Sequence, residues 1–337
     1  MKTLLVGINA KYVHTNLAIR NIAACLRSED INIYEATIND SLDGILEDIM
    51  GYNADVVGFS CYLWNIEGVL YLAENIKKIK PETVIVLGGP EVSYEIENLL
   101  KTQSHIDYVI IGEGEQRFGK LLKVLEGKIA LASVDGIAYR HDNDIVINSP
   151  KSYVDLNQIP FSYTDENLEN KLVYYEPSRG CYFKCAFCLS SLEDDVRFAD
   201  IEKVREDFLR FVRMGIKVVK LVDRSFNCRL SRALKLLEII RERPGNTVFH
   251  CEINPELVNE DFIKALKGLE DRLQFEIGIQ STNPVTLKEI CRTPDVKRAL
   301  EGIRQLKTTG IKLHVDLIAG LPLENFESFS RSFDDVY

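Results

Sequence analysis

The chain has 337 residues with 46% apolar and 27% charged side chains, ordinary values that exclude long disordered or fibrous segments. Its 51 acidic and 41 basic residues give a net charge of −10, which opposes binding to nucleic acid or to an anionic membrane. No apolar run approaches the roughly 18 residues of a membrane span and the N-terminus lacks the apolar stretch of a signal peptide, so we expect a cytoplasmic protein of about two domains.

Residues 1–127 alternate short apolar runs, rich in β-branched residues, with helical patterns. Runs without polar alternation suit strands that are buried on both faces of a sheet. Strands and helices that alternate through short loops predict a parallel, doubly wound sheet, whose ligands bind at the carboxyl ends of the strands. The five expected strands are residues 2–9, 31–38, 55–60, 83–87 and 108–111.

Loops with glycine or small polar residues follow the last three of these strands. Glycine lets a backbone approach a large ligand closely, and helix N-termini just behind such loops favour anionic groups. One loop of this kind is weak evidence, because roughly half are only tight turns. The residues in question are Ser60 and Tyr62, then Gly88 and Gly89, then Gly112 and Glu113.

Residues 128–171 form an irregular segment, which we expect to link two domains. Extended runs at 136–140 and 145–147 flank an Asn/Asp turn at 142–144, a pattern that predicts a β-hairpin. Further on, the chain is expected to be extended up to Pro160, because the residue before a proline avoids helical geometry.

Residues 172–337 resume the alternation of strands and helices. Five β/α units predict a partial TIM barrel, with sites at the C-terminal ends of its strands. On the fourth strand Gln274, Glu276 and Gly278 alternate with apolar residues, and this period of two places them on one face, which in a barrel can be the lumen. The expected strands are residues 172–177, 217–222, 247–251, 273–279 and 311–318.

Three of the eight cysteines, Cys181, Cys185 and Cys188, fall close together after the first strand of this second region. Chance clustering is improbable, so a metal site is the leading explanation. A structural zinc site needs four ligands, usually two CxxC pairs, and here Cys228 or His250 would have to be brought in by the fold. Three cysteine ligands on a 4Fe–4S cluster would instead leave one iron with an open position.

The CxxxCxxC spacing, with Phe187 before the third cysteine, resembles the signature of the radical S-adenosylmethionine (radical SAM) superfamily. The resemblance implies that SAM binds the open iron and is cleaved to methionine and a 5′-deoxyadenosyl radical. The glycine loops of residues 1–125 are similar to those of the cobalamin-binding domain in cobalamin-dependent members. It follows from this resemblance that an N-terminal Rossmann-like cobalamin domain precedes a radical SAM barrel, which we expect to be truncated because such barrels usually have six units.

The resemblance also assigns roles to individual residues. The three cysteines would hold the cluster, and the backbone of Phe187 would recognise the adenine of SAM. His14 stands near the position of a cobalt-binding histidine, but the Asp and Gly of the family's DxHxxG loop are absent, so we expect no ligation of cobalt by His14. The remaining assignments are Asp223, Glu276, Gln280 and Ile318 for SAM, and Ser60, Tyr62, Gly88, Gly89, Gly112 and Glu113 for cobalamin.

Two of these assignments have a purely structural alternative. Asp223 could instead form a salt bridge with Arg224, and Glu276 could belong to an inward ion pair that only orders the barrel. Lys184 and Arg179 could raise the reduction potential of the cluster or could simply be solvated. We expect Glu324 to face solvent at the start of a helix.

The preferred functional hypothesis is a cobalamin-dependent radical SAM enzyme that transfers a methyl group to an unactivated carbon of an unidentified small molecule or peptide. It would need a one-electron reductant such as flavodoxin or ferredoxin. A cyclase or rearrangement enzyme with the same cofactors, and a cobalamin carrier or sensor with an idle barrel, remain alternatives. Methylthio transfer is disfavoured, because such enzymes take a second cluster from three N-terminal cysteines and only Cys25 and Cys61 are available.

Overall fold

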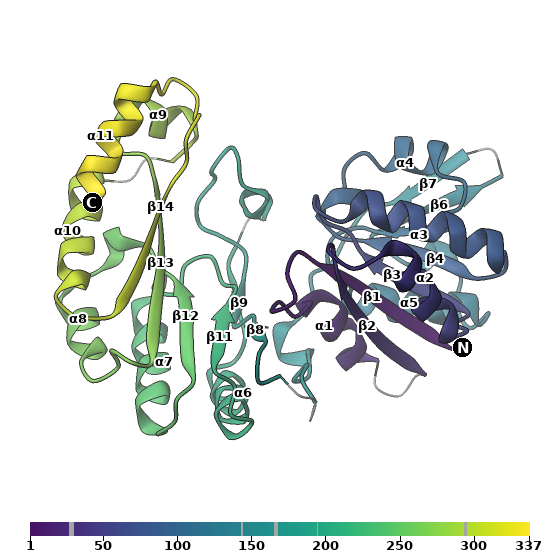
Figure 1. The fold of residues 1–337 in the computed structure, drawn as a ribbon, viewed down its shortest axis with the longest axis horizontal. Coiled ribbons are helices and arrows are strands. Elements are labelled where there is room, and N and C mark those ends of the chain that lie inside the picture. Colours follow the sequence, from purple (N-terminus) through teal and green to yellow (C-terminus); the bar gives the residue numbers. More distant parts are fainter. Residues whose placement is uncertain (27–29, 143, 165–167, 194, 293–294) are drawn as a thin grey trace. The chain divides into compact units, whose positions relative to one another are not determined.

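The computed structural model describes residues 1–26, 30–142, 144–164, 168–193, 195–292 and 295–337. The chain divides into two compact units, Met1–Glu166 and Asn167–Tyr337, and each contains its own large sheet (Figure 1). Among the described residues, no helix is both long enough and apolar enough to cross a membrane.

A seven-stranded sheet forms the first unit, in the order β2-β1-β3-β4-β5-β6-β7. All five strands expected from the sequence are present and parallel to one another. Every residue of β1 is buried, because helices cover both faces of the sheet. The strands are β1 (Thr3–Asn9), β2 (Ile31–Thr37), β3 (Val56–Ser60), β4 (Val84–Gly88), β5 (Tyr108–Ile110), β6 (Ile137–His141) and β7 (Asp144–Asn148).

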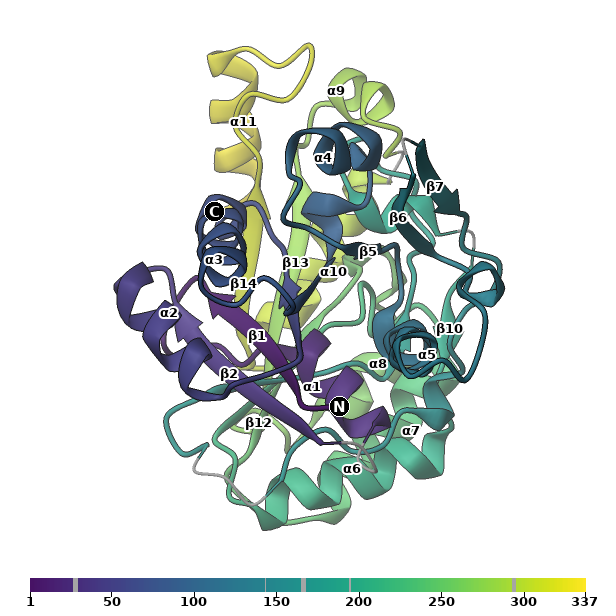
Figure 2. The same cartoon turned by 90° about the vertical axis from the view of Figure 1, so that its right-hand side faces the viewer.

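Five helices cover this sheet in two layers. Figure 2 shows α2 (Leu42–Gly51), α3 (Ile66–Ile79) and α4 (Ile96–Thr102) on one face, and their apolar side chains share a core with the sheet. The opposite face carries α1 (Leu17–Cys25) and α5 (Gly114–Leu125), which share a second core. The sheet is therefore doubly wound, as its alternating sequence predicts.

The hairpin β6-β7, expected within a linker, instead continues the first sheet, because β6 pairs antiparallel with β5. The buried guanidinium of Arg117 on α5 fixes it by donating to Asp135 at 3.0 Å and to the Ser152 carbonyl at 2.7 Å. Gly136 has a φ of 63°, and a Cβ there would lie 2.3 Å from Arg117 Nε. Most of the expected linker thus belongs to the first unit; residue 143 of the expected turn lies outside the described residues.

Five parallel strands form the sheet of the second unit, in the order β14-β13-β12-β11-β8, and they lie side by side in Figure 1. These are the five strands that the sequence predicts: β8 (Leu172–Tyr175), β11 (Val218–Leu221), β12 (Val248–Glu252), β13 (Leu273–Gln280) and β14 (Lys312–Leu317). A small antiparallel pair, β9 (Ser178–Arg179) and β10 (Arg197–Phe198), stands beside them. The helices are α6 (Ile201–Arg213), α7 (Leu230–Glu242), α8 (Glu260–Leu266), α9 (Pro284–Glu289), α10 (Val296–Lys307) and α11 (Phe326–Val336).

The two faces of this second sheet differ in polarity. Along β13 the apolar residues are buried, whereas Gln274, Glu276, Gly278 and Gln280 between them are only half-buried. β12 alternates in the same way. Buried and half-buried residues therefore alternate along β13 as its sequence predicts. Because neighbouring strands share this alternation, their polar side chains lie on one face of the sheet.

Candidate functional site

The three clustered cysteines lie on the loop that follows β8 and β9. Cys181 and Cys185 are buried and Cys188 is half-buried. The Phe183 amide donates to Cys181 Sγ at 3.4 Å, and the Cys188 amide donates to the Cys185 carbonyl at 3.1 Å. Burial raises the pKa of the Cys181 thiol, and the proximity of Cys188 and Cys185 raises it further. The loop therefore presents three thiols to one region in a fixed turn.

Three thiols on one loop are donors of the kind that a 4Fe–4S cluster takes. Each thiolate of such a cluster binds a different iron, so the sulfurs must stand farther apart than around one metal ion. In the described part of the chain, no three Cys, His, Asp or Glu side chains are gathered closely enough to hold a single ion. Burial raises the pKa of the Cys228 thiol to about 11, with Asp223 as a further cause.

Two cations beside the cysteines are bound to other groups. Lys184 Nζ donates to the carbonyls of Ser191 at 3.0 Å and Glu193 at 2.5 Å, which closes the loop on itself. Arg179 Nη2 lies 2.6 Å from Glu176 Oε2. The alternative that these side chains are simply solvated therefore fails for the largely buried Arg179, whereas Lys184 is exposed.

The polar face of the second sheet contains a cluster of charges. Lys220 Nζ from β11 lies 2.6 Å from Glu276 Oε2 on β13. His250 Nε2 from β12 lies 3.1 Å from the same oxygen, although its geometry makes no hydrogen bond. The proximity of His250 and Lys220 lowers the pKa of Glu276 to about 2. Glu276 thus adopts the inward ion pair considered as its structural alternative.

Asp223 lies just beyond the end of β11 and is 4% exposed. Burial raises the pKa of its carboxyl to about 7, and the nearby Glu252 adds to the effect. Arg224 does not pair with it, since its Nη1 lies 3.5 Å from Glu252 Oε1. Among the described residues, Asp223 Oδ1 has no hydrogen-bond partner. The alternative of an Asp223–Arg224 salt bridge is therefore wrong.

The other SAM candidates lie at the same ends of the strands. Gln280 has a φ of 71°, a left-handed conformation at a register shift in β13, and its carbonyl accepts from the Ile318 amide at 3.0 Å. Phe187 is exposed on the cysteine loop. Glu324 does not face solvent as expected, because its Oε1 accepts a 2.5 Å hydrogen bond from Ser281.

In the first unit, a cavity of about 540 Å³ that opens to solvent lies between the sheet and helices α1 and α5. Of the six residues expected to bind cobalamin, five line it: Ser60, Tyr62, Gly88, Gly89 and Gly112. Glu113 is not among the lining residues; its Oε2 accepts from the Val154 amide at 2.5 Å. The cavity therefore assembles most of the residues that the sequence singled out.

Glycine stands at the positions around this cavity for different structural reasons. At Gly88 a Cβ would meet Ile110 only at the ordinary distance of 3.7 Å, so the missing side chain leaves space open. At Gly89 a Cβ would lie 2.4 Å from the Cys61 carbonyl, and its φ of 119° is a conformation that other residues rarely adopt. A Cβ at Gly58 would lie 2.8 Å from the Phe118 ring. Gly88 thus serves the cavity, whereas Gly89 serves the backbone.

Two asparagines that sequence reasoning missed organise the edge of the cavity. Asn16 caps α1 and donates to Ser60 Oγ at 2.8 Å. Asn65 donates to the carbonyls of Ile8 at 3.0 Å and Ser60 at 2.9 Å, which joins the ends of β1 and β3. Asn16 carried a sequence signal as an N-cap ahead of an apolar helix. The carbonyl of His14 accepts from Asn9 Nδ2 at 3.1 Å.

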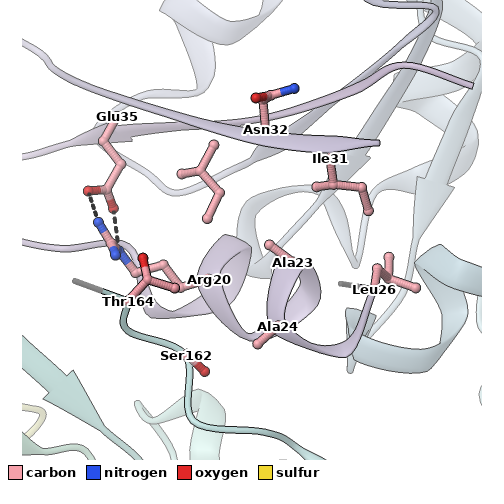
Figure 3. Close-up of a pocket in the computed structure, with 10 residues that line it drawn as sticks. Arg20, Ala23, Ala24, Leu26, Ile31, Asn32, Glu35, Ser162 and Thr164 are labelled. Carbon is pink, nitrogen blue, oxygen red and sulfur yellow. Dashed lines mark hydrogen bonds and ion pairs between the residues drawn. The ribbon is translucent and has the colours of Figure 1, made fainter. Parts of the chain in front are cut away.

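A second hollow lies between α1 and the edge strand β2 and has an open volume of about 1080 Å³ (Figure 3). Arg20 on α1 points toward Glu35 on β2, and Arg20 Nη2 lies 2.8 Å from Glu35 Oε2. Both side chains are largely buried. This ion pair holds α1 to the sheet, and α1 in turn supplies one wall of the first cavity.

Another residue that sequence reasoning missed touches the cysteine loop. Arg292 Nη1 lies 3.6 Å from Cys185 Sγ, although the two residues are 107 positions apart. No local pattern signals such a contact, because it arises from the way the end of α9 folds back on the loop.

Two family models match the chain. One, described as a B12 binding domain, matches residues 3–122 and covers the strands and helices around the cavity. The other, described as the radical SAM superfamily, matches residues 175–336 and includes the cysteine loop.

Relatives match across most of the chain at low identity. An uncharacterised methyltransferase of Pyrococcus horikoshii is 26% identical over 95% of this chain and 74% of its own length. The cobalamin-dependent radical SAM methyltransferase TokK of Streptomyces tokunonensis is 24% identical over 97% of this chain and 50% of its own length. An anaerobic magnesium-protoporphyrin IX monomethyl ester cyclase of Synechocystis is 28% identical over 72% of this chain and 50% of its own length. The chain therefore spans about half the length of the last two.

A solved structure shows the same fold. The cobalamin-dependent SAM radical enzyme OxsB, with aqua-cobalamin and S-adenosylmethionine bound, superposes with a TM-score of 0.84 at 18% identity. The match covers 99% of this chain and 52% of that one. The two-part α/β fold expected from the sequence is confirmed.

Proposed function

Because the chain belongs to the cobalamin-dependent radical SAM family, we propose that it cleaves S-adenosylmethionine and transfers a methyl group to an unactivated carbon. When bound, a 4Fe–4S cluster would supply the electron that splits SAM, and cobalamin would carry the methyl group. Every other task falls to the residues of the chain: they hold the cofactors, orient SAM and keep water away from the radical.

In the first unit, the cavity would hold part of the corrinoid by shape. Its described lining contains no charged side chain, and the missing side chain of Gly88 leaves space beside Ile110. Ser60 stands at its polar edge, oriented by the amide of Asn16. An uncharged cavity of this kind suits a large ligand that is mostly apolar over the inserted part.

In the second unit, the thiols of Cys181, Cys185 and Cys188 would hold the cluster. Asp223 and Gln280, at the ends of β11 and β13, would orient SAM next to it. The unpartnered Oδ1 of Asp223 supports this role, since a buried carboxyl oxygen without a hydrogen-bond partner is costly unless a ligand supplies one.

The single observation that carries the proposal is the placement of three thiols on one loop at the carboxyl end of a parallel β/α sheet. The test uses protein reconstituted anaerobically with iron, sulfide and hydroxocobalamin, then supplied with reductant and SAM labelled in its methyl group. We expect formation of 5′-deoxyadenosine and appearance of label on the isolated corrinoid. Neither should occur with Cys188→Ala.

The alternatives give different results in the same experiment. The cyclase relative keeps a second hypothesis open, in which the radical serves ring closure or rearrangement. That activity would give 5′-deoxyadenosine without transfer of label. A cobalamin carrier with an idle barrel would bind the corrinoid and release no 5′-deoxyadenosine, which would contradict the proposal.

The proposed reaction also needs a one-electron reductant, for which flavodoxin or ferredoxin is the suitable class of partner. This is tested by reducing the reconstituted protein with flavodoxin and with ferredoxin in turn, and by measuring the 5′-deoxyadenosine that forms. The substrate is proposed only as a small molecule or peptide with an unactivated C–H bond.

A further inference from the structure

The cysteine loop is tied to a distant segment by one arginine. Arg292 Nη2 donates to the Gly278 carbonyl on β13 at 2.6 Å, while Nη1 lies 3.6 Å from Cys185 Sγ. The guanidinium carbon also lies 5.0 Å from the centre of the Phe183 ring. One planar cation therefore contacts a strand, a thiol and an aromatic ring, and the last two belong to the cysteine loop.

A second contact joins the same two segments. The Ala186 amide donates to the Ile290 carbonyl at 3.0 Å, just before Arg292 in the chain. Since Ala186 follows Cys185 directly, the backbone contact and the side-chain contact hold the same part of the loop. Two separate bonds to one short segment restrict the loop more than either bond alone.

The segment that carries Arg292 is itself fixed. Helix α9 ends in a pair of hydrogen bonds, from the Arg292 amide to the Leu287 carbonyl at 2.8 Å and from the Cys291 amide to the Lys288 carbonyl at 3.1 Å. Cys291 between them has a φ of 55°. This is the Schellman arrangement, which reverses the chain sharply at a helix end. It turns Arg292 back toward the loop.

We propose that Arg292 is a positioning residue that shapes the cysteine loop before the cluster is present and places a positive charge beside Cys185 once it is bound. The inference rests on the proposed function, because it requires Cys185 to be a cluster ligand. A cationic donor next to a ligand sulfur stabilises the more negative, reduced cluster and so raises its reduction potential.

The test compares Arg292→Met, Arg292→Lys and the exposed control Arg304→Met in the full chain. First, amide exchange at Ala186 is measured in the cluster-free protein with its thiols reduced. We expect Arg292→Met to speed this exchange at least tenfold, Arg292→Lys to restore part of the protection, and Arg304→Met to match the original chain.

Second, the midpoint potential of the reconstituted cluster is measured by EPR-monitored titration, which a purely structural role would not change. We expect Arg292→Met to shift the one-electron equilibrium about tenfold toward the oxidised cluster, roughly 59 mV. Arg292→Lys should recover most of that shift. The proposal is overturned if either the exchange rate at Ala186 or the potential is unchanged in Arg292→Met.

These outcomes are separable from a failure of the proposed function. If the unmodified chain assembled no cluster, the proposed function would fall. The exchange measurement needs no iron, so it would still decide whether Arg292 holds the loop.

Discussion

The two units of this protein prepare for their ligands in opposite ways. The cavity of the first unit is lined mainly by glycines and apolar residues, and no described lining residue is charged. The corresponding face of the second unit is crowded with charges, among them Lys220, Glu276 and Arg224. If these are the ligand sites as proposed, the first unit would recognise its ligand by shape, and binding there should respond to added volume. The second unit would recognise its ligand through electrostatics, and binding there should respond to charge and pH.

The largest expected effect tests the charged, metal-binding side of this comparison. Replacing Cys185 by Ala should abolish the iron–sulfur absorption of the reconstituted protein, because a cluster with two cysteine ligands is not retained. Visible absorption together with iron and sulfide analysis measures this. Cys228→Ala is the matched control and should keep about four irons per chain; loss of iron there would reveal a fourth ligand and contradict the open site.

The next effect concerns the backbone of the first unit. Gly89→Ala places a Cβ 2.4 Å from the Cys61 carbonyl in a conformation that only glycine adopts readily. We expect the free energy of unfolding to fall by about 2 kcal/mol or more, as measured by urea unfolding followed through the fluorescence of Trp64. Gly51→Ala, where a Cβ meets nothing within 4 Å, should cost no stability. Equal stability of the two variants would refute the strain at Gly89.

A smaller effect sharpens the role of shape. Gly88→Leu should fill space in the cavity without backbone strain, because a Cβ there makes only an ordinary contact. We expect hydroxocobalamin to bind at least tenfold more weakly, about 1.4 kcal/mol, with the iron content unchanged. Isothermal titration measures the affinity. If the variant bound as tightly as the original chain, the cavity would not be the corrinoid site.

The smallest effect follows from the buried acid of the second unit. The pKa of Asp223 is raised to about 7, so the folded chain holds its proton more tightly than the unfolded chain does. The free energy of unfolding should therefore fall as pH rises from about 4 to about 7. Asp223→Asn should remove this part of the pH dependence, and the difference between pH 5 and pH 8 should shrink by at least about 1 kcal/mol.

Urea unfolding of the cluster-free chain at the two pH values, followed by circular dichroism, tests the last expectation. Asp261→Asn, which changes an exposed acid on α8, is the control and should leave the pH dependence intact. A pH dependence in Asp223→Asn equal to that of the original chain would show that Asp223 is already ionised in the fold.

Periodicity was enough to predict the parallel strands of both sheets, and spacing was enough to single out the cysteine loop. In strands 2–9 and 273–279 the residue pattern itself predicts which side chains are buried. The clustering of the three cysteines can likewise be seen from their spacing, without tertiary information. The partners of charged residues were not accessible in this way. Glu276 on β13 pairs with Lys220 on β11 across the intervening strand β12. Arg224 pairs with Glu252 rather than with its sequence neighbour Asp223. Such pairings depend on strand order and register, which local sequence does not contain.

The glycine loops show the same limit in a milder form. Their position after strands predicted the cavity, but the sequence could not distinguish Gly88, which leaves space, from Gly89, which the backbone requires. Glu113 looked equivalent to its neighbours, yet its side chain turns to Val154. The direction of a side chain at a strand end is decided by the segments that pack over it.

The hairpin β6-β7 affects how the first unit is made and handled. During synthesis residues 1–125 leave the ribosome before Ile137 and Ala138, so the edge of β5 stays open until β6 arrives and pairs with it. An open parallel edge next to apolar side chains recruits other chains and promotes aggregation. A fragment cut after residue 127 would keep that open edge permanently. One that continues to residue 164 would carry its own cover, including the Arg117 contacts to Asp135 and Ser152.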